Sequence, residues 1–295
     1  VHKQQLKVLG QKWETFDVYD FRGEKLRDKL ESFLSKGNIS GMLYSNPNNP
    51  SWICFTEKEL KIIAELADKY NVVVLEDLAY VGMDFRKNLY TPGKSPYQAT
   101  VARYTNNYIL FISNSKAFSY AGQRIGMMII SDQLFEKICP DLKRYYASDT
   151  FGRAMIFGTV YALSAGVTHS AQYAVAAMLK AANDGEFNFV DIVKEYGEKA
   201  KIMKKLFIDN GFKIVYDKDE DELIADGFYF TIKRKNMTGG ELLHSMLLFG
   251  MSGIPMRTTG TKREGVRICV SLVPLEQYGE LEKRVNALDA FLKKP

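Results

Sequence analysis

The sequence predicts an α/β fold, with a mostly parallel sheet covered by helices on both faces and a small C-terminal α+β domain. In the first half, short apolar runs alternate with stretches whose apolar residues repeat at helical spacing. From about Ser131 the pattern is mostly helical, and after Glu186 short strands and helices mix again. We therefore expect part of a large domain over residues 1–145, connecting helices over 146–185 and a small domain over 186–295.

The first elements are predicted from short patterns near the start of the chain. Residues 1–11 indicate the end of a helix, and residues 13–19 (WETFDVY) indicate a strand. Residues 24–34 place four apolar side chains on one helical face. Residues 39–45 (ISGMLYS) form a predicted strand that ends in a turn containing proline and asparagine.

The next helix and strands follow directly. Thr56 and Glu59 have the spacing of a capping box, in which each side chain binds the other's backbone N–H at a helix start. Residues 71–77 (NVVVLED) form an apolar run without polar alternation, as is typical of buried parallel strands. Residues 108–113 and 127–131 are predicted to be two more such strands.

The second half adds mainly helices. Helices are predicted over residues 132–146, 152–164 and 169–184, and then for a long segment whose apolar side from Phe189 to Phe207 repeats at helical spacing. The small domain is expected to hold strands at 212–217, 227–234 and 265–272, with helices at 239–250 and from Tyr278 to Leu292.

Composition excludes several classes of protein. The chain has 295 residues, 46% of them hydrophobic, and a net charge of +5 from 40 basic and 35 acidic residues that are spread along the sequence. We therefore expect neither nucleic acid nor a membrane as partner, and no apolar run reaches membrane-spanning length. Three cysteines without metal spacing favour a reducing, cytoplasmic compartment. The three histidines lie far apart, so no metal site is expected.

Polar residues follow several predicted strands. Asn49 comes after residues 39–45, Asp77 ends residues 71–77, and Lys116 follows residues 108–113 between Ser113 and Arg124. In parallel sheets, ligands bind beyond the carboxyl ends of the strands. These residues are therefore the candidates for a binding site. The alternative is that Lys116 is a solvated loop lysine and that Asn49 and Asp77 are ordinary turn residues.

Four motifs in this order resemble the class I/II aminotransferases, which are fold type I enzymes dependent on pyridoxal 5′-phosphate (PLP). They are SNPNNP (45–50), EDLAY (76–80), SNSKAFSYAGQRIG (113–126) and GVRICVSL (265–272). The resemblance covers nearly the whole chain. It implies that residues 1–145 are part of the large PLP-binding domain.

The resemblance implies a role for each candidate. Lys116 would bind the cofactor aldehyde covalently and later move a proton. Ser113 and Arg124 would bind its phosphate, because a guanidinium offers two charge-assisted hydrogen bonds at once. Asp77 would keep the pyridine nitrogen protonated, and its alternative role is to close a turn.

Three further residues complete the implied site. Tyr80 and Asn49 would hydrogen-bond the phenolic oxygen of the cofactor, and Asn49 would also lie at the substrate. By its position in the GVRICVSL motif, Arg267 would bind the substrate α-carboxylate. The alternation of that strand places it on one face with Cys269 and Ser271. Arg267 could instead be an ordinary solvated arginine on the sheet surface, and Tyr80 could be an ordinary half-buried tyrosine.

The sequence departs from the family in two places. The family motif usually continues Asn-Pro-Thr-Gly, but here Ser51 and Trp52 follow Asn49 and Pro50. The family also has an N-terminal portion that supplies a ring stacked on the pyridine and part of the phosphate site, and neither can be placed here. We therefore expect the chain to be the C-terminal part of a longer enzyme and to bind PLP weakly by itself.

The expected function is transfer of an amino group between an amino acid and a 2-oxo acid. Another reaction on the same scaffold, such as C–S β-elimination or decarboxylation, would use the same lysine and aspartate. An aminotransferase-like effector domain of a transcription regulator is a third possibility. The resemblance further implies a homodimer in the full-length enzyme.

Overall fold

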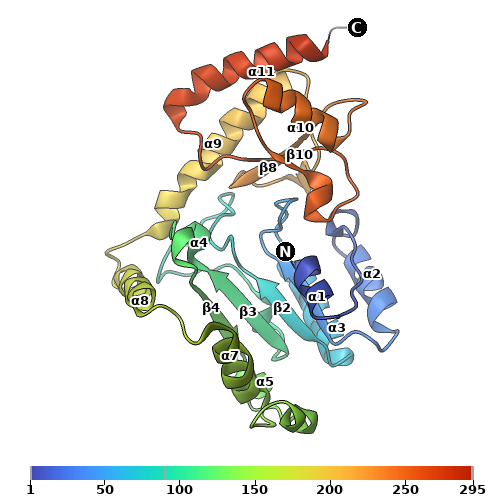
Figure 1. The fold of residues 1–295 in the computed structure, drawn as a ribbon, viewed down its shortest axis with the longest axis vertical. Coiled ribbons are helices and arrows are strands. Elements are labelled where there is room, and N and C mark those ends of the chain that lie inside the picture. Colours follow the sequence, from blue (N-terminus) through green and yellow to red (C-terminus); the bar gives the residue numbers. More distant parts are fainter. Residues whose placement is uncertain (1, 90, 294–295) are drawn as a thin grey trace.

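The computed structural model describes residues 2–89 and 91–293. Figure 1 shows a sheet in its lower half, built from the first 130 residues, and a second group of strands and helices above it, built from the C-terminal part. Helix α1 (His2–Val8) buries none of its residues and lies between these two parts in the view. The domain boundaries at residues 145 and 185 stay a prediction.

The lower sheet has the strand order β1-β2-β3-β4. Its strands are β1 (Gly41–Ser45), β2 (Val73–Asp77), β3 (Tyr108–Ser113) and β4 (Gly126–Ile130). The first three are parallel, but β4 runs antiparallel to β3 with Ser113 opposite Gly126, so the prediction that residues 127–131 form a parallel strand is wrong. A parallel pair needs a long crossover, whereas residues 114–125 hold only short α4 (Asn114–Ala117) and the 3₁₀ turn η3 (Ala121–Gln123).

Helices α2 (Lys25–Leu34) and α3 (Glu57–Lys69) cover one face of this sheet. The capping box predicted at the start of α3 is confirmed, because Thr56 Oγ1 accepts from the Glu59 N–H and Glu59 accepts from the Thr56 N–H. On the opposite face Leu43, in the outer strand β1, is 42% exposed. The core under α2 and α3 is therefore closed, while the other face stays partly open.

Residues 13–19 do not form the predicted strand. The segment is irregular up to the 3₁₀ turn η1 (Val18–Asp20). Its side chains bind unrelated partners: Phe16 stacks on Phe33, Asp17 accepts from the Tyr216 hydroxyl at 2.6 Å, and Tyr19 donates to Asp217 at 2.7 Å. The segment is therefore held by separate side-chain contacts rather than by pairing with a neighbouring strand.

The helix predicted over residues 132–146 is broken in two. Helix α5 covers Asp132–Phe135, and a 3₁₀ turn, η4, covers Pro140–Arg144. Proline has no N–H and disfavours helical backbone in the residue before it. Cys139 accordingly leaves the helix, and its N–H donates to the Asp149 carbonyl at 2.8 Å.

Residues 151–164 form one continuous helical rod, as predicted within a residue. It consists of α6 (Phe151–Arg153), a π-helical stretch η5 (Ala154–Tyr161) and α7 (Ala162–Ser164). Helix α8 (His169–Asn183) follows, close to the bounds that the sequence predicts. Among residues 2–89 and 91–293, no helix has the length and apolar character needed to cross a bilayer.

The upper part is built around a second, antiparallel sheet with the order β5-β8-β10-β9. Helices α9, α10 and α11 pack on it and form its apolar core. The bounds are α9 (Phe189–Asp209), β5 (Lys213–Ile214), β8 (Tyr229–Lys233), α10 (Gly239–Leu248), β9 (Ile254–Pro255), β10 (Val266–Cys269) and α11 (Tyr278–Leu292), with the separate hairpin β6 (Lys218–Asp219) and β7 (Glu222–Leu223) and the 3₁₀ turns η2 (Val101–Arg103), η6 (Met256–Thr259) and η7 (Leu275–Gln277).

An apolar cluster joins the two parts. Trp52 and Tyr80 from the lower part pack with Phe228 and Tyr229 from the upper part. Trp52 is 1% exposed and has left-handed backbone (φ 63°), a rare conformation for so bulky a residue. A side chain at Gly227 would place Cβ 2.2 Å from the indole, so only glycine leaves room for Trp52 there.

A buried ionic cluster also joins the two parts. The Arg22 guanidinium donates twice to Glu59 of α3, at 2.7 Å each, and also binds Asp219 of the β6–β7 hairpin. Arg86 donates to Asp84 at 2.8 and 2.9 Å and to Asp219 at 2.8 Å. Asp219 therefore receives two arginines from the lower part, which attaches the hairpin of the upper part to it.

Candidate active site

The predicted site residues lie at the carboxyl ends of the parallel strands and at the junction with the upper sheet. Asp77 is the last residue of β2, Ser113 is the last of β3, and Lys116 lies in α4 directly after it. Asn49 lies in the loop after β1, and Arg267 lies in β10 of the upper sheet. The structure arranges them in two neighbouring groups.

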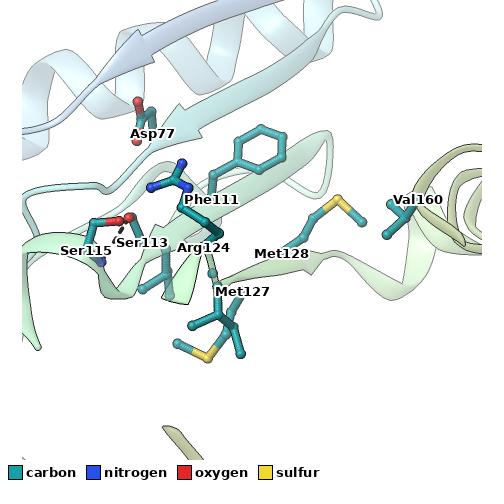
Figure 2. Close-up of a pocket in the computed structure, with 11 residues that line it drawn as sticks. Asp77, Phe111, Ser113, Ser115, Arg124, Met127, Met128 and Val160 are labelled. Atoms are coloured by element: carbon teal, nitrogen blue, oxygen red, sulfur yellow. Dashed lines mark hydrogen bonds between the residues drawn. The ribbon is translucent and has the colours of Figure 1, made fainter. Parts of the chain in front are cut away.

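The first group lines a pocket of about 410 Å³. Its polar side chains are Asp77, Ser113, Ser115 and Arg124, and Figure 2 shows the Arg124 guanidinium between Asp77 and the two serines. Its apolar wall is formed by Phe111, Ile112, Ile125, Met127, Met128 and Val160. One pocket thus offers a carboxylate, two hydroxyls and a guanidinium to a ligand.

Among residues 2–89 and 91–293, the Asp77 carboxylate makes one hydrogen bond. Its Oδ1 accepts from the Ala79 N–H at 2.9 Å, which is the turn-closing role that an aspartate commonly has at this position. Its Oδ2 lies 3.8 Å from Nε2 of His2 in helix α1, and the side chain is 26% exposed. One carboxylate oxygen is therefore available to a ligand in the pocket.

Ser113 and Arg124 are held by local backbone contacts. Ser113 Oγ accepts from the Ser115 N–H at 3.2 Å. Arg124 has left-handed backbone (φ 52°), and its guanidinium donates to the Ala121 carbonyl at 3.0 Å. Within the described ranges it makes no ion pair with a carboxylate, so an anion in the pocket would be its first charged partner.

The second group is a chain of hydrogen bonds across the junction. Asn49 Nδ2 donates to the Tyr80 hydroxyl at 3.3 Å, and Arg267 donates to Asn49 Oδ1 at 2.5 Å. The Tyr80 hydroxyl in turn donates to that of Tyr229 at 3.1 Å. Arg267 Nε is buried and has no partner in residues 2–89 and 91–293. The structure thus brings together Asn49, Tyr80 and Arg267, which lie far apart in the sequence.

Lys116 lies beside the second group. Its Nζ is 4.4 Å from the centroid of the Phe228 ring, and like Arg267 it makes no ion pair among the residues that the structure describes. Burial lowers the pKa of the Lys116 ammonium; Cys269 opposes this shift, and the positive charge of Arg267 adds to it. A lysine with a lowered pKa loses its proton more readily and becomes nucleophilic.

Sequence reasoning missed Tyr229, Phe228 and Ser115. Tyr229 and Phe228 lie in the predicted strand 227–234, but the sequence does not show which face of that strand meets the strand carrying Arg267. Their register, with Tyr229 opposite Cys269, appears only in the paired sheet. Ser115 could have been suggested by its place between Ser113 and Lys116.

Comparison with curated relatives points to one family. Over 198 residues the chain is 26% identical to the probable aspartate aminotransferase of Methanocaldococcus jannaschii, covering 60% of this chain and 49% of that protein. Over 225 residues it is 23% identical to human kynurenine–oxoglutarate transaminase 3, covering 76% of this chain and 42% of that protein. The chain thus spans about half the length of these relatives.

Solved structures share the fold. The N-succinyldiaminopimelate aminotransferase of Mycobacterium tuberculosis superposes with a TM-score of 0.70 at 16% identity, covering 96% of this chain and 67% of that one. The aspartate aminotransferase of Thermus thermophilus with maleate gives 0.67 at 17% identity, covering 90% and 59%. The family model of aminotransferase class I and II matches residues 2–281, and the chain therefore belongs to the class I and II aminotransferase family.

Proposed function

We propose that the protein carrying this chain is a PLP-dependent aminotransferase, which moves an amino group between an amino acid and a 2-oxo acid. The observation that carries the proposal is the set of three cations without a carboxylate partner among the described residues: Lys116, Arg124 and Arg267. Burying positive charge is unfavourable unless an anion joins it. Two of the three are partly buried, and the site is therefore suited to negatively charged ligands.

The residues present fit PLP. A pocket of about 410 Å³ has Asp77 for a pyridine N–H and Ser113, Ser115 and Arg124 for a phosphate. When bound, PLP supplies an electron sink for bonds at the α-carbon of an amino acid. Lys116 would hold the cofactor covalently and then carry the proton, for which its lowered pKa is suited. Tyr80 and Asn49 would bind the phenolic oxygen of the cofactor.

Arg267 would bind the α-carboxylate of the substrate. A carboxylate matches the planar guanidinium fork, and Asn49 already fixes one end of that fork. The orphaned Nε is a donor that a carboxylate could satisfy. An amino acid and a 2-oxo acid share this carboxylate, so one arginine would serve both halves of the reaction.

Borohydride reduction of the PLP-loaded protein tests the assignment. We expect pyridoxyl label on Lys116 and none in Lys116→Ala, while Lys58→Ala, an exposed lysine paired with Glu24, keeps the label. Label at another lysine, with Lys116→Ala still binding covalently, would end the proposal. An assay with and without a 2-oxo acid separates transamination from elimination, because a lyase releases ammonia without a second substrate.

We further propose that the full-length protein is a homodimer in a reducing compartment. Exposed apolar side chains on the rod at residues 151–164, such as Phe157, Tyr161 and Leu163, support an association surface. The free cysteines Cys54 and Cys139 fit a reducing cytoplasm. Sedimentation of the full-length protein measures its oligomeric state, and a monomer throughout the working concentration range would contradict the first part.

A further inference from the structure

We propose that Tyr229 is a positioning residue that holds two groups of the candidate site at once, with its hydroxyl on Tyr80 and its ring against Arg267. Tyr229 lies in β8 of the upper sheet, whereas Tyr80 follows β2 of the lower sheet. The inference rests on the proposed aminotransferase function for the roles of Tyr80 and Arg267. It adds a residue of the upper sheet that contacts Tyr80 across the junction and Arg267 in the neighbouring strand.

The hydroxyl contact fixes the Tyr80 phenol. Tyr80 donates to Tyr229 at 3.1 Å and accepts from Asn49 at 3.3 Å, so its oxygen is held from two sides. The two tyrosines are 6% and 7% exposed, and their rings meet edge to face with centroids 5.5 Å apart. A buried hydroxyl needs such a partner, and Tyr229 provides the acceptor for the Tyr80 proton.

The ring contact fixes the Arg267 guanidinium. Arg267 Cζ lies 4.0 Å from the centroid of the Tyr229 ring, within the range of a cation–π interaction. Arg267 is thus held between this ring and the Asn49 amide. Its Nε remains without a partner in the described part of the chain. The ring therefore orients the guanidinium while leaving a donor for a carboxylate.

The strand register explains why Tyr229 can do both. Tyr229 pairs directly with Cys269, which makes Arg267 its diagonal neighbour across β8 and β10. Diagonal neighbours on one sheet face lie within reach of aromatic and long side chains. Behind Tyr229, the Trp52 ring packs edge to face at 5.8 Å, which leaves the phenol little freedom to turn. Tyr229 is thus held rigidly enough to position others.

Two substitutions separate the two roles. Tyr229→Phe keeps the ring and removes the hydroxyl, whereas Tyr229→Leu removes both. In the PLP-loaded protein we expect Tyr229→Leu to raise KM for amino acids about 2- to 30-fold, which is 0.5–2 kcal/mol at 1.4 kcal/mol per decade. Tyr229→Phe keeps KM within roughly twofold. Tyr216→Phe is the matched control, because it removes a buried hydroxyl that donates to Asp17 at 2.6 Å outside the site.

The Tyr229 hydroxyl also affects the pKa of Tyr80. Burial raises this pKa, and Tyr229 raises it further; Arg267 lowers it and Asp77 raises it. Tyr229→Phe removes the part of the rise that comes from Tyr229, while the part that comes from burial stays.

A double-mutant cycle without cofactor tests the same contact independently of turnover. Denaturant unfolding is measured for Tyr80→Phe, Tyr229→Phe and the double variant. We expect the double variant to lose less stability than the sum of the two single losses, and strict additivity would overturn the link. Unchanged KM in Tyr229→Leu would overturn the ring contact. If Arg267→Lys itself leaves KM unchanged, the substrate role of Arg267 fails instead, while the cycle still decides the Tyr80–Tyr229 link.

Discussion

Two arginine-containing regions of the molecule, the ionic cluster and the candidate site, differ in what surrounds their charges. In the ionic cluster, Arg22 and Arg86 bind three buried carboxylates, and their hydrogen bonds are satisfied within the protein. In the candidate site, Arg124 and Arg267 bind only a carbonyl and an amide among the described residues. The positive charges of the ionic cluster are neutralised within the protein, whereas those of the candidate site are left for a ligand.

The difference shows how one residue type serves two purposes. A satisfied guanidinium attaches the β6–β7 hairpin to the lower part, so its loss is expected to appear in stability. An unsatisfied guanidinium contributes little to the free energy of unfolding, so its removal is expected to weaken ligand binding instead. Four measurements test this contrast, beginning with the largest expected effect.

Removing Arg22 is expected to cost the most. Arg22→Leu leaves Glu59 buried without its cation and leaves Asp219 with Arg86 alone, and such a loss costs about 3–5 kcal/mol of unfolding free energy. Denaturant unfolding measures it. Arg27→Ala, which breaks the exposed pair with Glu65, is the control and should cost at most about 1 kcal/mol. Equal losses in the two variants would remove the distinction between the clusters.

Two buried glutamates should make the unfolding free energy depend on pH in opposite directions. Burial raises the pKa of Glu59, but the hydrogen bonds and charge of Arg22 outweigh this and hold it below its usual value. Glu76 has no cation, and burial raises its pKa from 4.5 to about 7. The stability from protonated Glu76 is therefore complete below pH 4.5 and is lost as pH rises through about 7.

Glu76→Gln tests this dependence. We expect it to remove a decline of about 3 kcal/mol in unfolding free energy between pH 4.5 and about 7, since one pKa unit is about 1.4 kcal/mol. Val101 N–H and the Asn46 amide donate to different oxygens of Glu76, at 2.8 and 3.2 Å. Glutamine keeps an oxygen for only one of them, so the variant loses one hydrogen bond at every pH, and the prediction concerns the slope with pH alone. The check is the denaturation midpoint at several pH values, and an unchanged slope in the variant would show that Glu76 is charged in the native state.

Arg267→Lys should affect substrate binding more than folding. Lysine keeps the charge but loses the fork, and losing one hydrogen bond to a charged group costs about 1.5–3 kcal/mol. We expect KM for amino acids to rise roughly tenfold or more in the PLP-loaded protein, with the cofactor absorbance unchanged. Steady-state kinetics with a fixed 2-oxo acid measure it. An unchanged KM would make Arg267 a structural residue, like Arg22.

Arg124→Gln is expected to have the smallest effect on stability. Its side chain is exposed and loses only the bond to the Ala121 carbonyl, so the change in unfolding free energy stays within about 0.5 kcal/mol. Affinity for PLP should fall, because a charge-assisted contact is lost. Titration with PLP beside denaturant unfolding separates the two quantities, and a large loss of stability with unchanged affinity would reverse the contrast.

The sequence predicts local structure better than the contacts between distant segments. The capping box at Thr56, the strands around Asp77 and Ser113, and helix α9 follow from periodicity and end signals. The direction of β4 does not, because an apolar strand looks alike in either direction. The expected strand at residues 13–19 fails because its side chains bind separate partners.

The candidate site divides in the same way. Lys116 and Asp77 could be placed from motifs, because Asp77 ends one strand and Lys116 comes shortly after the end of the next. Tyr229 could not, since its contact with Tyr80 depends on how two sheets approach each other. The ionic cluster around Asp219 could not be predicted from the sequence either, because its members lie far apart along the chain and no local spacing connects them.

The burial of Trp52 has a spectroscopic consequence. The chain has two tryptophans, of which Trp13 is 40% exposed and Trp52 is 1% exposed. Replacing Trp13 with phenylalanine would leave one indole, and its fluorescence would come from the junction of the two parts. A buried indole emits at shorter wavelength than a hydrated one. Because Trp52 packs on both Tyr80 and Tyr229, any ligand that separates the two sheets should shift its emission to the red, which makes this indole an optical reporter of the contact between them.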